Sequence, residues 1–255
     1  PRHRDRSAPC GRASRRSRSA GASCGRSAVD ADATLVSLID AQVARTRGRP
    51  LPSGQVTPKA AALFMVGLSF VGLAVLLQFN RFAVMTGIAS LAIVAIYPFM
   101  KRITWWPQVW LGLVFSWAAL VGWTETWGWL SAGGVLLYAG GIFWVVGYDT
   151  IYALQDREDD ALVGIRSSAL RMGQHVRGGV GVCYALAVAL WAAALWQVRA
   201  DPLALVALLP VAAHLAWQVL TLAPDDGAGA LARFRSNRFA GLLMFLACVV
   251  VGTPL

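Results

Sequence analysis

The chain has 255 residues, of which 57% are hydrophobic and only 14% are charged, and its formal net charge is +10. This composition is too apolar for an ordinary soluble domain and is typical of membrane proteins. The positive charge does not indicate a nucleic-acid partner, because no nucleic-acid-binding motif accompanies it. The four cysteines show no C-x-x-C or Cys/His spacing, so the sequence gives no support for a zinc site.

Residues 1–29 mix Arg, Ser, Gly and Ala without apolar periodicity. Such a segment cannot bury enough apolar surface to offset the entropy of ordering, so we expect it to be disordered. It lacks the apolar core of a secretory signal, and a transit peptide or a lipid tether is the alternative. Because the chain begins with Pro, we also expect this segment to be non-native and to replace a first span. The folded membrane domain is predicted to cover residues 30–255.

Arginines come next in the chain, at alternate positions just before two prolines. Arg45, Arg47 and Arg49 precede Pro50 and Pro52, and proline disfavours helix at the preceding residue, so we predict an extended loop. The guanidinium group is suited to recognising phosphate, which makes these arginines candidate anion ligands. The alternative is a basic loop that serves only membrane topology.

Successive apolar runs of spanning length dominate the rest of the chain, and we predict seven membrane spans. A soluble all-helical bundle is the alternative, and seven runs this apolar argue against it. Gly67, Gly72 and Gly87 are expected to allow close approach of neighbouring helices. The predicted spans are residues 60–78, 81–99, 108–124, 129–148, 178–198, 202–222 and 238–254.

Lysine and arginine fall in two sets on alternate sides of these spans, and the richer set should face the cytoplasm. The poorer set contains only Arg81 and Arg199. The richer set contains Arg45, Arg47, Arg49, Lys59, Lys101, Arg102, Arg157, Arg166, Arg171, Arg177, Arg233, Arg235 and Arg238.

The connections between spans hold further candidates. Residues 97–107 are expected to link the second and third spans, and Lys101 and Arg102 in this link are either anion ligands or topology charges. Residues 223–237 are expected to form a polar loop. His175 is expected to be solvated, whereas His214, inside an apolar span, is expected to form a hydrogen bond in a packing role.

The most informative stretch is the acidic one from Tyr148 to Asp160. In a helix, Asp149, Tyr152, Asp156 and Asp160 would lie on one face. Neighbouring carboxylates repel each other unless a cation lies among them, and oxygen ligands favour a hard cation such as Mg²⁺. The alternative is a solvated acidic helix end.

Three segments of the sequence together resemble the UbiA prenyltransferase superfamily, and most of all its 4-hydroxybenzoate polyprenyltransferases. Tyr148-Asp-Thr-x-Tyr-Ala-x-x-Asp-Arg-x-Asp-Asp160, followed by Gly164-Ile-Arg-Ser-Ser168, resembles the second aspartate-rich motif of that superfamily. Arg45-Thr-x-x-Arg-Pro-Leu-Pro-Ser-Gly54 and Tyr97-Pro-x-x-Lys-Arg102 are similar to further family segments.

The family's first motif, Asn-Asp-x-x-Asp-x-x-x-Asp, is present only in part. Asp40 holds its last position, whereas Asp32, Ala33 and Val36 stand at the other three. We therefore expect a UbiA-like, all-α transmembrane bundle of about seven spans, with one or two N-terminal spans missing or replaced. We also expect little turnover by the chain as written until an apolar span that ends in the complete motif is restored.

The resemblance implies transfer of a polyprenyl group from polyprenyl diphosphate to the ring carbon of 4-hydroxybenzoate, in ubiquinone biosynthesis. Mg²⁺ is the implied cofactor, membrane lipid the implied surroundings, and the cytoplasmic face of the cell inner membrane the implied location. The alternatives are a prenyltransferase with another acceptor (homogentisate, a naphthoate, heme or a lipid alcohol), a transporter, and an inactive homologue. The implied metal ligands are Asp40, Asp149, Asp156 and Asp160, with Tyr152 beside them, and the implied substrate ligands are Arg45, Arg49, Lys101, Arg102 and Arg166.

Overall fold

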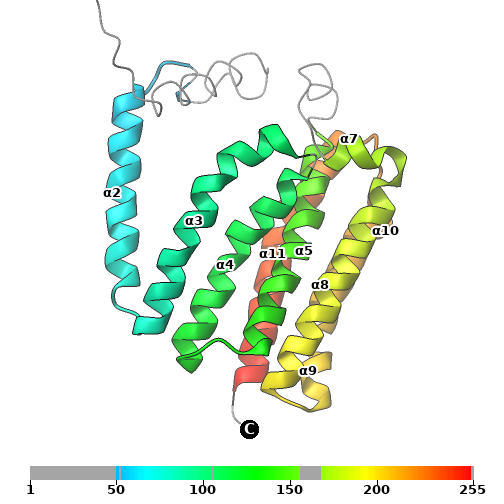
Figure 1. Ribbon diagram of the computed structural model, residues 1–255. Coiled ribbons are helices and arrows are strands. Elements are labelled where there is room, and N and C mark those ends of the chain that lie inside the picture. The colour runs from blue at the N-terminus through cyan, green and yellow to red at the C-terminus, as the bar shows by residue number, and fades with distance from the viewer. Residues whose placement is uncertain (1–49, 52, 105, 156–167, 254–255) are drawn as a thin grey trace, which may run out of the picture. The chain divides into compact units, whose positions relative to one another are not determined.

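The computed structural model describes residues 50–51, 53–104, 106–155 and 168–253, and the described residues contain helices and no strand. The prediction of an all-α fold is therefore confirmed (Figure 1). The helices are α2 (Pro58–Leu76), α3 (Arg81–Ile103), α4 (Pro107–Trp127), α5 (Ala132–Ala153), α7 (Ser168–Met172), η1 (Gly173–His175), α8 (Val176–Val198), α9 (Pro202–Val206), α10 (Leu209–Thr221) and α11 (Gly227–Gly252).

Each of the seven predicted spans overlaps one helix, or the pair α9 and α10, and five of the seven are long and apolar enough to cross a membrane; α3 and α4, which overlap 81–99 and 108–124, do not meet that measure. A long apolar helix suits a membrane because all its backbone hydrogen bonds form within the segment. The chain is therefore a multi-pass membrane protein. Residues 81–97 of α3 form a shorter apolar helix. Among the described residues, the segments long and apolar enough to cross a membrane are Pro58–Leu76, Ala132–Ala153, Ser168–Val198, Pro202–Thr221 and Gly227–Gly252.

The chain divides into two compact units, residues 1–65 and 66–255. The described part of the first unit is a turn followed by the start of α2. The Gly54 amide donates to the Leu51 carbonyl at 3.2 Å, and Gly54 has a φ of 75°, a conformation that glycine adopts without strain. The Thr57 hydroxyl then accepts a hydrogen bond from the Ala60 amide and caps the helix.

Within the second unit, successive long helices run antiparallel (Figure 1). The turn before α3 is tied to the end of α4, because the Asn80 side chain donates to the carbonyls of Thr124 and Glu125 at 2.8 and 3.0 Å. The same side chain caps α3 by accepting from the Ala83 amide. The end of α5 and the starts of α8 and α11 consequently lie at one end of the unit, and Arg199 lies at the other.

Glycines on α5 allow the closest helix packing in this unit. A Cβ added at Gly140 would overlap the Trp191 indole of α8, and one added at Gly147 would overlap the Tyr184 ring. Small residues let two helix backbones approach closely in a membrane. The expectation placed on Gly67 and Gly72 is wrong, because a Cβ at either position would have open space around it.

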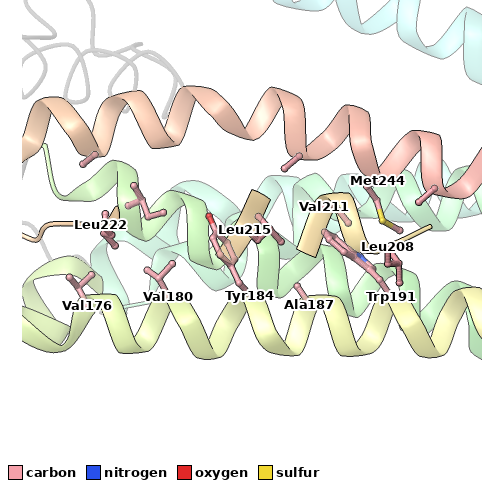
Figure 2. Packing of buried hydrophobic residues seen from close by; sticks show 14 of the residues in the cluster. Val176, Val180, Tyr184, Ala187, Trp191, Leu208, Val211, Leu215, Leu222 and Met244 are labelled. Carbon is pink, nitrogen blue, oxygen red and sulfur yellow. The ribbon is translucent and has the colours of Figure 1, made fainter. Parts of the chain in front are cut away.

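The buried apolar core lies mainly between α5, α8, α10 and α11. One face of α8, formed by Val176, Val180, Tyr184, Ala187 and Trp191, points into it (Figure 2). Leu208, Val211, Leu215 and Leu222 from the α9–α10 region and Met244 from α11 complete the labelled cluster in Figure 2.

Two connections predicted as loops are largely helical. Helix α11 begins at Gly227, not near residue 238, because Asp226 caps it by accepting from the Gly229 amide at 2.8 Å and alanines follow. Most of the predicted loop 223–237 is thus the first part of α11. Helix α3 likewise continues to Ile103, so most of the predicted link 97–107 is helical.

Candidate functional site

The last turns of α5 carry Asp149 and Tyr152, the two predicted site residues whose side chains the structure describes. Both are half-buried. The Tyr152 and Tyr148 rings pack on Phe234 of α11, with ring centroids 4.5 and 5.8 Å apart. The negative charge of Asp149 acts on the phenol of Tyr148 on the same helix and on that of Tyr97 of α3.

The two ends of the acidic segment are tied together by a buried hydrogen bond. The Thr150 hydroxyl donates to the Val146 carbonyl at 2.7 Å, which leaves its oxygen to accept from the Ser168 hydroxyl at 2.8 Å. Thr150 is 1% exposed and Ser168 is fully buried. The end of α5 and the start of α7, which flank residues 156–167 in the sequence, therefore lie against each other.

Most of the predicted ligands lie outside the described residues. Helix α5 ends at Ala153, so the predicted helical stripe is observed for Asp149 and Tyr152 only. Lys101 and Arg102 lie at the end of α3, and their side chains are not described. Within the described ranges, no three His, Cys, Asp or Glu side chains come together as a metal site. The predicted site residues outside the described ranges are Asp40, Arg45, Arg49, Asp156, Asp160 and Arg166.

A cavity of about 440 Å³ runs along α5 from Tyr148, the residue next to Asp149, to Leu137, nearly three turns away. Its wall is almost wholly apolar and aromatic. The side chains that line it are Phe115, Ser116 and Ala119 of α4; Leu137, Gly141, Trp144, Val145 and Tyr148 of α5; Trp191 of α8; and Met244, Phe245 and Cys248 of α11.

The α4 side of this region has buried polar atoms that find no hydrogen-bond partner among the described residues. They are Gln108 Oε1, Ser116 Oγ and Trp123 Nε1. Ser116, which is 8% exposed, lines the cavity, and a Cβ added at Gly141 would lie 2.8 Å from its hydroxyl. Gly141 of α5 faces Ser116 of α4, and Gly134 faces Trp123, so the two helices are antiparallel. Continued along both helices, this pairing places Gln108, which is 4% exposed, level with the end of α5 that carries Asp149.

The opposite side contains a connected set of buried side chains that the sequence analysis did not single out. Trp144 of the cavity wall donates to Asn237 Oδ1 at 2.9 Å. Asn237 Nδ2 lies 3.3 Å from Gln218 Oε1, which also accepts from the Tyr184 hydroxyl at 2.8 Å. A glutamine inside an apolar span was the available signal, since buried polar groups are nearly always hydrogen-bonded.

The two histidines for which a role was predicted, His175 and His214, behave as expected. His214 Nε2 lies 3.2 Å from the Ser236 hydroxyl, which confirms a hydrogen-bonded packing role. The ring also stacks obliquely on Trp217, with centroids 5.4 Å apart. His175 is exposed in η1, so its predicted solvation is also confirmed.

Comparison with known proteins gives one family. The model of the UbiA prenyltransferase family matches residues 37–249. A solved apo structure of a UbiA homolog from Aeropyrum pernix K1 shares the fold, with a TM-score of 0.68 and 23% sequence identity over 88% of this chain and 86% of that one.

Curated relatives named "4-hydroxybenzoate polyprenyltransferase, mitochondrial" are similar in sequence. The Aedes aegypti protein is 42% identical over 217 residues, which is 84% of this chain and 49% of that protein. The Drosophila melanogaster and Arabidopsis thaliana proteins are each 40% identical, over 85% and 83% of this chain and 55% and 52% of their own lengths. The chain thus spans about half the length of the curated relatives it matches.

Proposed function

Because the chain belongs to the UbiA prenyltransferase family, we propose that it transfers a polyprenyl group from polyprenyl diphosphate to the ring carbon of 4-hydroxybenzoate. The product is a 3-polyprenyl-4-hydroxybenzoate, a precursor of ubiquinone. The names of the similar proteins from insects and plants support this choice of acceptor.

The observation that carries the proposal is the position of the cavity relative to Asp149. An apolar cavity that begins at Tyr148 offers a place for isoprenoid units one residue along α5 from Asp149. A charged headgroup at the helix end and an apolar chain in the cavity would match the two halves of a polyprenyl diphosphate. Ligand pockets commonly combine an apolar wall with a few such polar groups.

The reaction breaks the bond between the allylic carbon and the diphosphate oxygen, and the diphosphate leaves with the bonding electrons. The ring carbon ortho to the phenol then forms the new bond to the allylic carbon, and the ring loses its proton. The Trp144 and Tyr148 rings at this end of the cavity would help to exclude water, and a site that excludes water protects the allylic cation from hydrolysis.

The donor set fits a hard divalent cation, because the proposed ligands Asp40, Asp149, Asp156 and Asp160 all offer carboxylate oxygens. The Thr150–Ser168 bond supports this assignment. It joins the end of α5, which precedes Asp156 and Asp160 in the sequence, to the start of α7, which follows them. Mg²⁺, when bound, would supply charge stabilisation for the leaving diphosphate. Arg45, Arg49, Lys101, Arg102 and Arg166 are the proposed anion ligands.

We also propose the location. The excess of Lys and Arg on the side of Asp149 indicates that this end of the bundle faces the compartment from which the protein is inserted. The similar proteins are mitochondrial, and the cell inner membrane is the corresponding proposal for a bacterial context.

A prenylation assay tests the function. Membranes that contain the chain, and membranes that contain a motif-restored chain in which an apolar span ending in Asn-Asp-x-x-Asp-x-x-x-Asp precedes Ala41, receive polyprenyl diphosphate, 4-hydroxybenzoate and Mg²⁺. We expect 3-polyprenyl-4-hydroxybenzoate, most of it from the motif-restored chain, and none after chelation of Mg²⁺. Prenylation of homogentisate, a naphthoate, heme or a lipid alcohol in its place would overturn the acceptor assignment.

A further inference from the structure

The buried polar side chains between α5, α8, α10 and α11 form one chain of hydrogen bonds whose directions can be assigned. The chain starts at a backbone carbonyl, which can only accept. The Ser236 hydroxyl donates to the Arg233 carbonyl at 2.7 Å, so its oxygen is left to accept from Gln218 Nε2 at 3.1 Å. The serine thereby fixes which end of the Gln218 amide points toward it.

The orientation of Gln218 then fixes that of Asn237. With its Nε2 used by Ser236, Gln218 presents Oε1 to the Tyr184 hydroxyl at 2.8 Å and to Asn237 Nδ2 at 3.3 Å. Asn237 Nδ2 also lies 3.2 and 3.3 Å from the carbonyls of Arg233 and Phe234. Every neighbour of Nδ2 is an acceptor, so Oδ1 is the end left for the Trp144 indole.

The central members of this chain of hydrogen bonds are buried, so the direction of each bond matters. Gln218 is fully buried, Tyr184 is 3% exposed and Asn237 is 7% exposed. Reversing either amide would set donor against donor or acceptor against acceptor where no water can compensate. The arrangement therefore has a single satisfied state, which holds the Trp144 indole in one orientation through the 2.9 Å bond from its Nε1.

Trp144 is the point at which the network reaches the cavity. Its ring lines the cavity and meets Tyr148 edge to face, with centroids 5.3 Å apart. Its other edge meets Trp191, with centroids 5.8 Å apart. Tyr148 precedes Asp149 in the chain. The indole therefore positions the part of the cavity wall that is nearest to Asp149 in the sequence.

We propose that Gln218 and Asn237 are positioning residues for prenyl transfer, which hold Trp144, and through it Tyr148, in the orientation that aligns the allylic end of the substrate beside Asp149. This inference rests on the proposed function for its kinetic consequence. The orientation of Trp144 is a separate claim and is measured without substrate.

The first measurement is the indole resonance of Trp144 in the ¹⁵N-tryptophan-labelled chain in nanodiscs, identified by its loss in Trp144→Phe. Asn237→Leu removes the acceptor and should move this resonance upfield. Gln218→Met, one bond further away, should move it in the same direction. Thr221→Val is the matched control, because it removes the bond from Arg233 Nε at 2.9 Å between the same two helices without touching the path to Trp144.

The second measurement is steady-state kinetics of the motif-restored chain. Asn237→Leu removes one buried hydrogen bond and should lower kcat/KM roughly tenfold. The fall should be mainly in kcat, because the change disturbs the alignment of the substrate and not its binding. If Asn237 acts through Trp144, the same change in the Trp144→Phe background should cost less than about twofold. Thr221→Val should match the parent in both backgrounds.

A Trp144 resonance unchanged by Asn237→Leu, or moved as far by Thr221→Val, would overturn the positioning network even where prenyl transfer proceeds. Effects of Asn237→Leu and Trp144→Phe that simply add would overturn the kinetic role. Should Asn237→Leu not accumulate in membranes, Gln218→Met decides both measurements. A moved resonance in a protein that prenylates no acceptor would contradict the proposed function and leave the network intact.

Discussion

The two sides of the bundle around the cavity differ in whether their buried polar atoms have hydrogen-bond partners. On the α8–α11 side, Tyr184, Gln218 and Asn237 are all hydrogen-bonded. On the α4 side, Gln108 Oε1 and Ser116 Oγ have no hydrogen-bond partner among the described residues. A buried polar atom left without a partner costs about 1–3 kcal/mol, so we expect the α4 side to be the less stable of the two.

The apolar core shows the same division. Among the described residues before α5, Ala83 and Leu120 are the buried hydrophobic ones, whereas the cluster from Ile151 to Val251 draws mainly on α5, α8, α10 and α11. We infer that the α8–α11 side is the rigid side of the cavity. On the other side, α4 can adjust its packing when a substrate binds. Unsatisfied groups near a site are a common sign of function.

The largest expected effect concerns Asp149, in the last turns of α5. Asp149→Asn removes the charge at the end of α5 and should lower prenyl transfer at least about 100-fold, the size expected for loss of a charge-stabilising group. The assay is product formation by the motif-restored chain in membranes. Asp201→Asn, at the other end of the unit, is the matched control, and activity of Asp149→Asn within a few-fold of the parent would remove Asp149 from the site.

The second prediction tests the rigid side of the cavity. Gly147→Ala places a Cβ into the Tyr184 ring and should destabilise the protein by about 1–3 kcal/mol, as overpacking of a close-packed core does. Gly122→Ala on α4, with open space around its Cβ, should leave stability equal or slightly higher. Thermal unfolding in detergent measures both. Equal melting temperatures would contradict the tight α5–α8 packing.

The third prediction compares a paired hydroxyl with an unpaired one. Tyr184→Phe removes a hydroxyl bonded to Gln218 and should cost about 1 kcal/mol. Ser116→Ala removes a hydroxyl without a partner among the described residues and should change stability by less than about 0.5 kcal/mol, or raise it. The free energy of unfolding without substrate is the measurement. A larger loss for Ser116→Ala would reverse the contrast between the two sides.

The smallest effect is expected at Asp201, at the opposite end of the unit from Asp149. The hydrogen bond from Arg199, 2.5 Å long, holds the pKa of Asp201 below its ordinary value of 3.8. A lowered folded-state pKa means that the stabilisation is present above the ordinary value and is lost as the pH falls through the lowered one. The melting temperature of Asp201→Asn should therefore lie slightly below that of the parent at neutral pH. The two should converge in acid, and a gap that widens in acid would show that the sign is wrong.

Much of the fold could be predicted from the sequence because a membrane span needs a long apolar run, and each such run overlaps a helix. The ends were harder to predict. Arg233 and Arg235 suggested a loop, whereas the Asp226 cap and following alanines extend α11 beyond its apolar part. Polar composition marks where a helix leaves the membrane, not where it stops.

The site was predictable only in part. The acidic motif pointed to Asp149 and Tyr152, whose place at the end of α5 follows from helical periodicity. The pairing of Tyr184 with Gln218 was not predictable, because 34 residues separate them and nothing local links α8 to α10. The glycines showed the same limit: Gly67 and Gly147 look alike in sequence, and only the neighbouring helix distinguishes them.

The most direct test of the account is to locate the isoprenoid chain on the protein. A polyprenyl diphosphate analogue with a photoreactive group in its first isoprenoid units is bound to the motif-restored chain, irradiated and mapped by mass spectrometry. We predict labels on the cavity residues Phe115, Trp144 and Phe245, which unlabelled polyprenyl diphosphate should abolish. Labels confined to α2 or α3, or labels that the unlabelled substrate does not reduce, would contradict a substrate cavity beside Asp149.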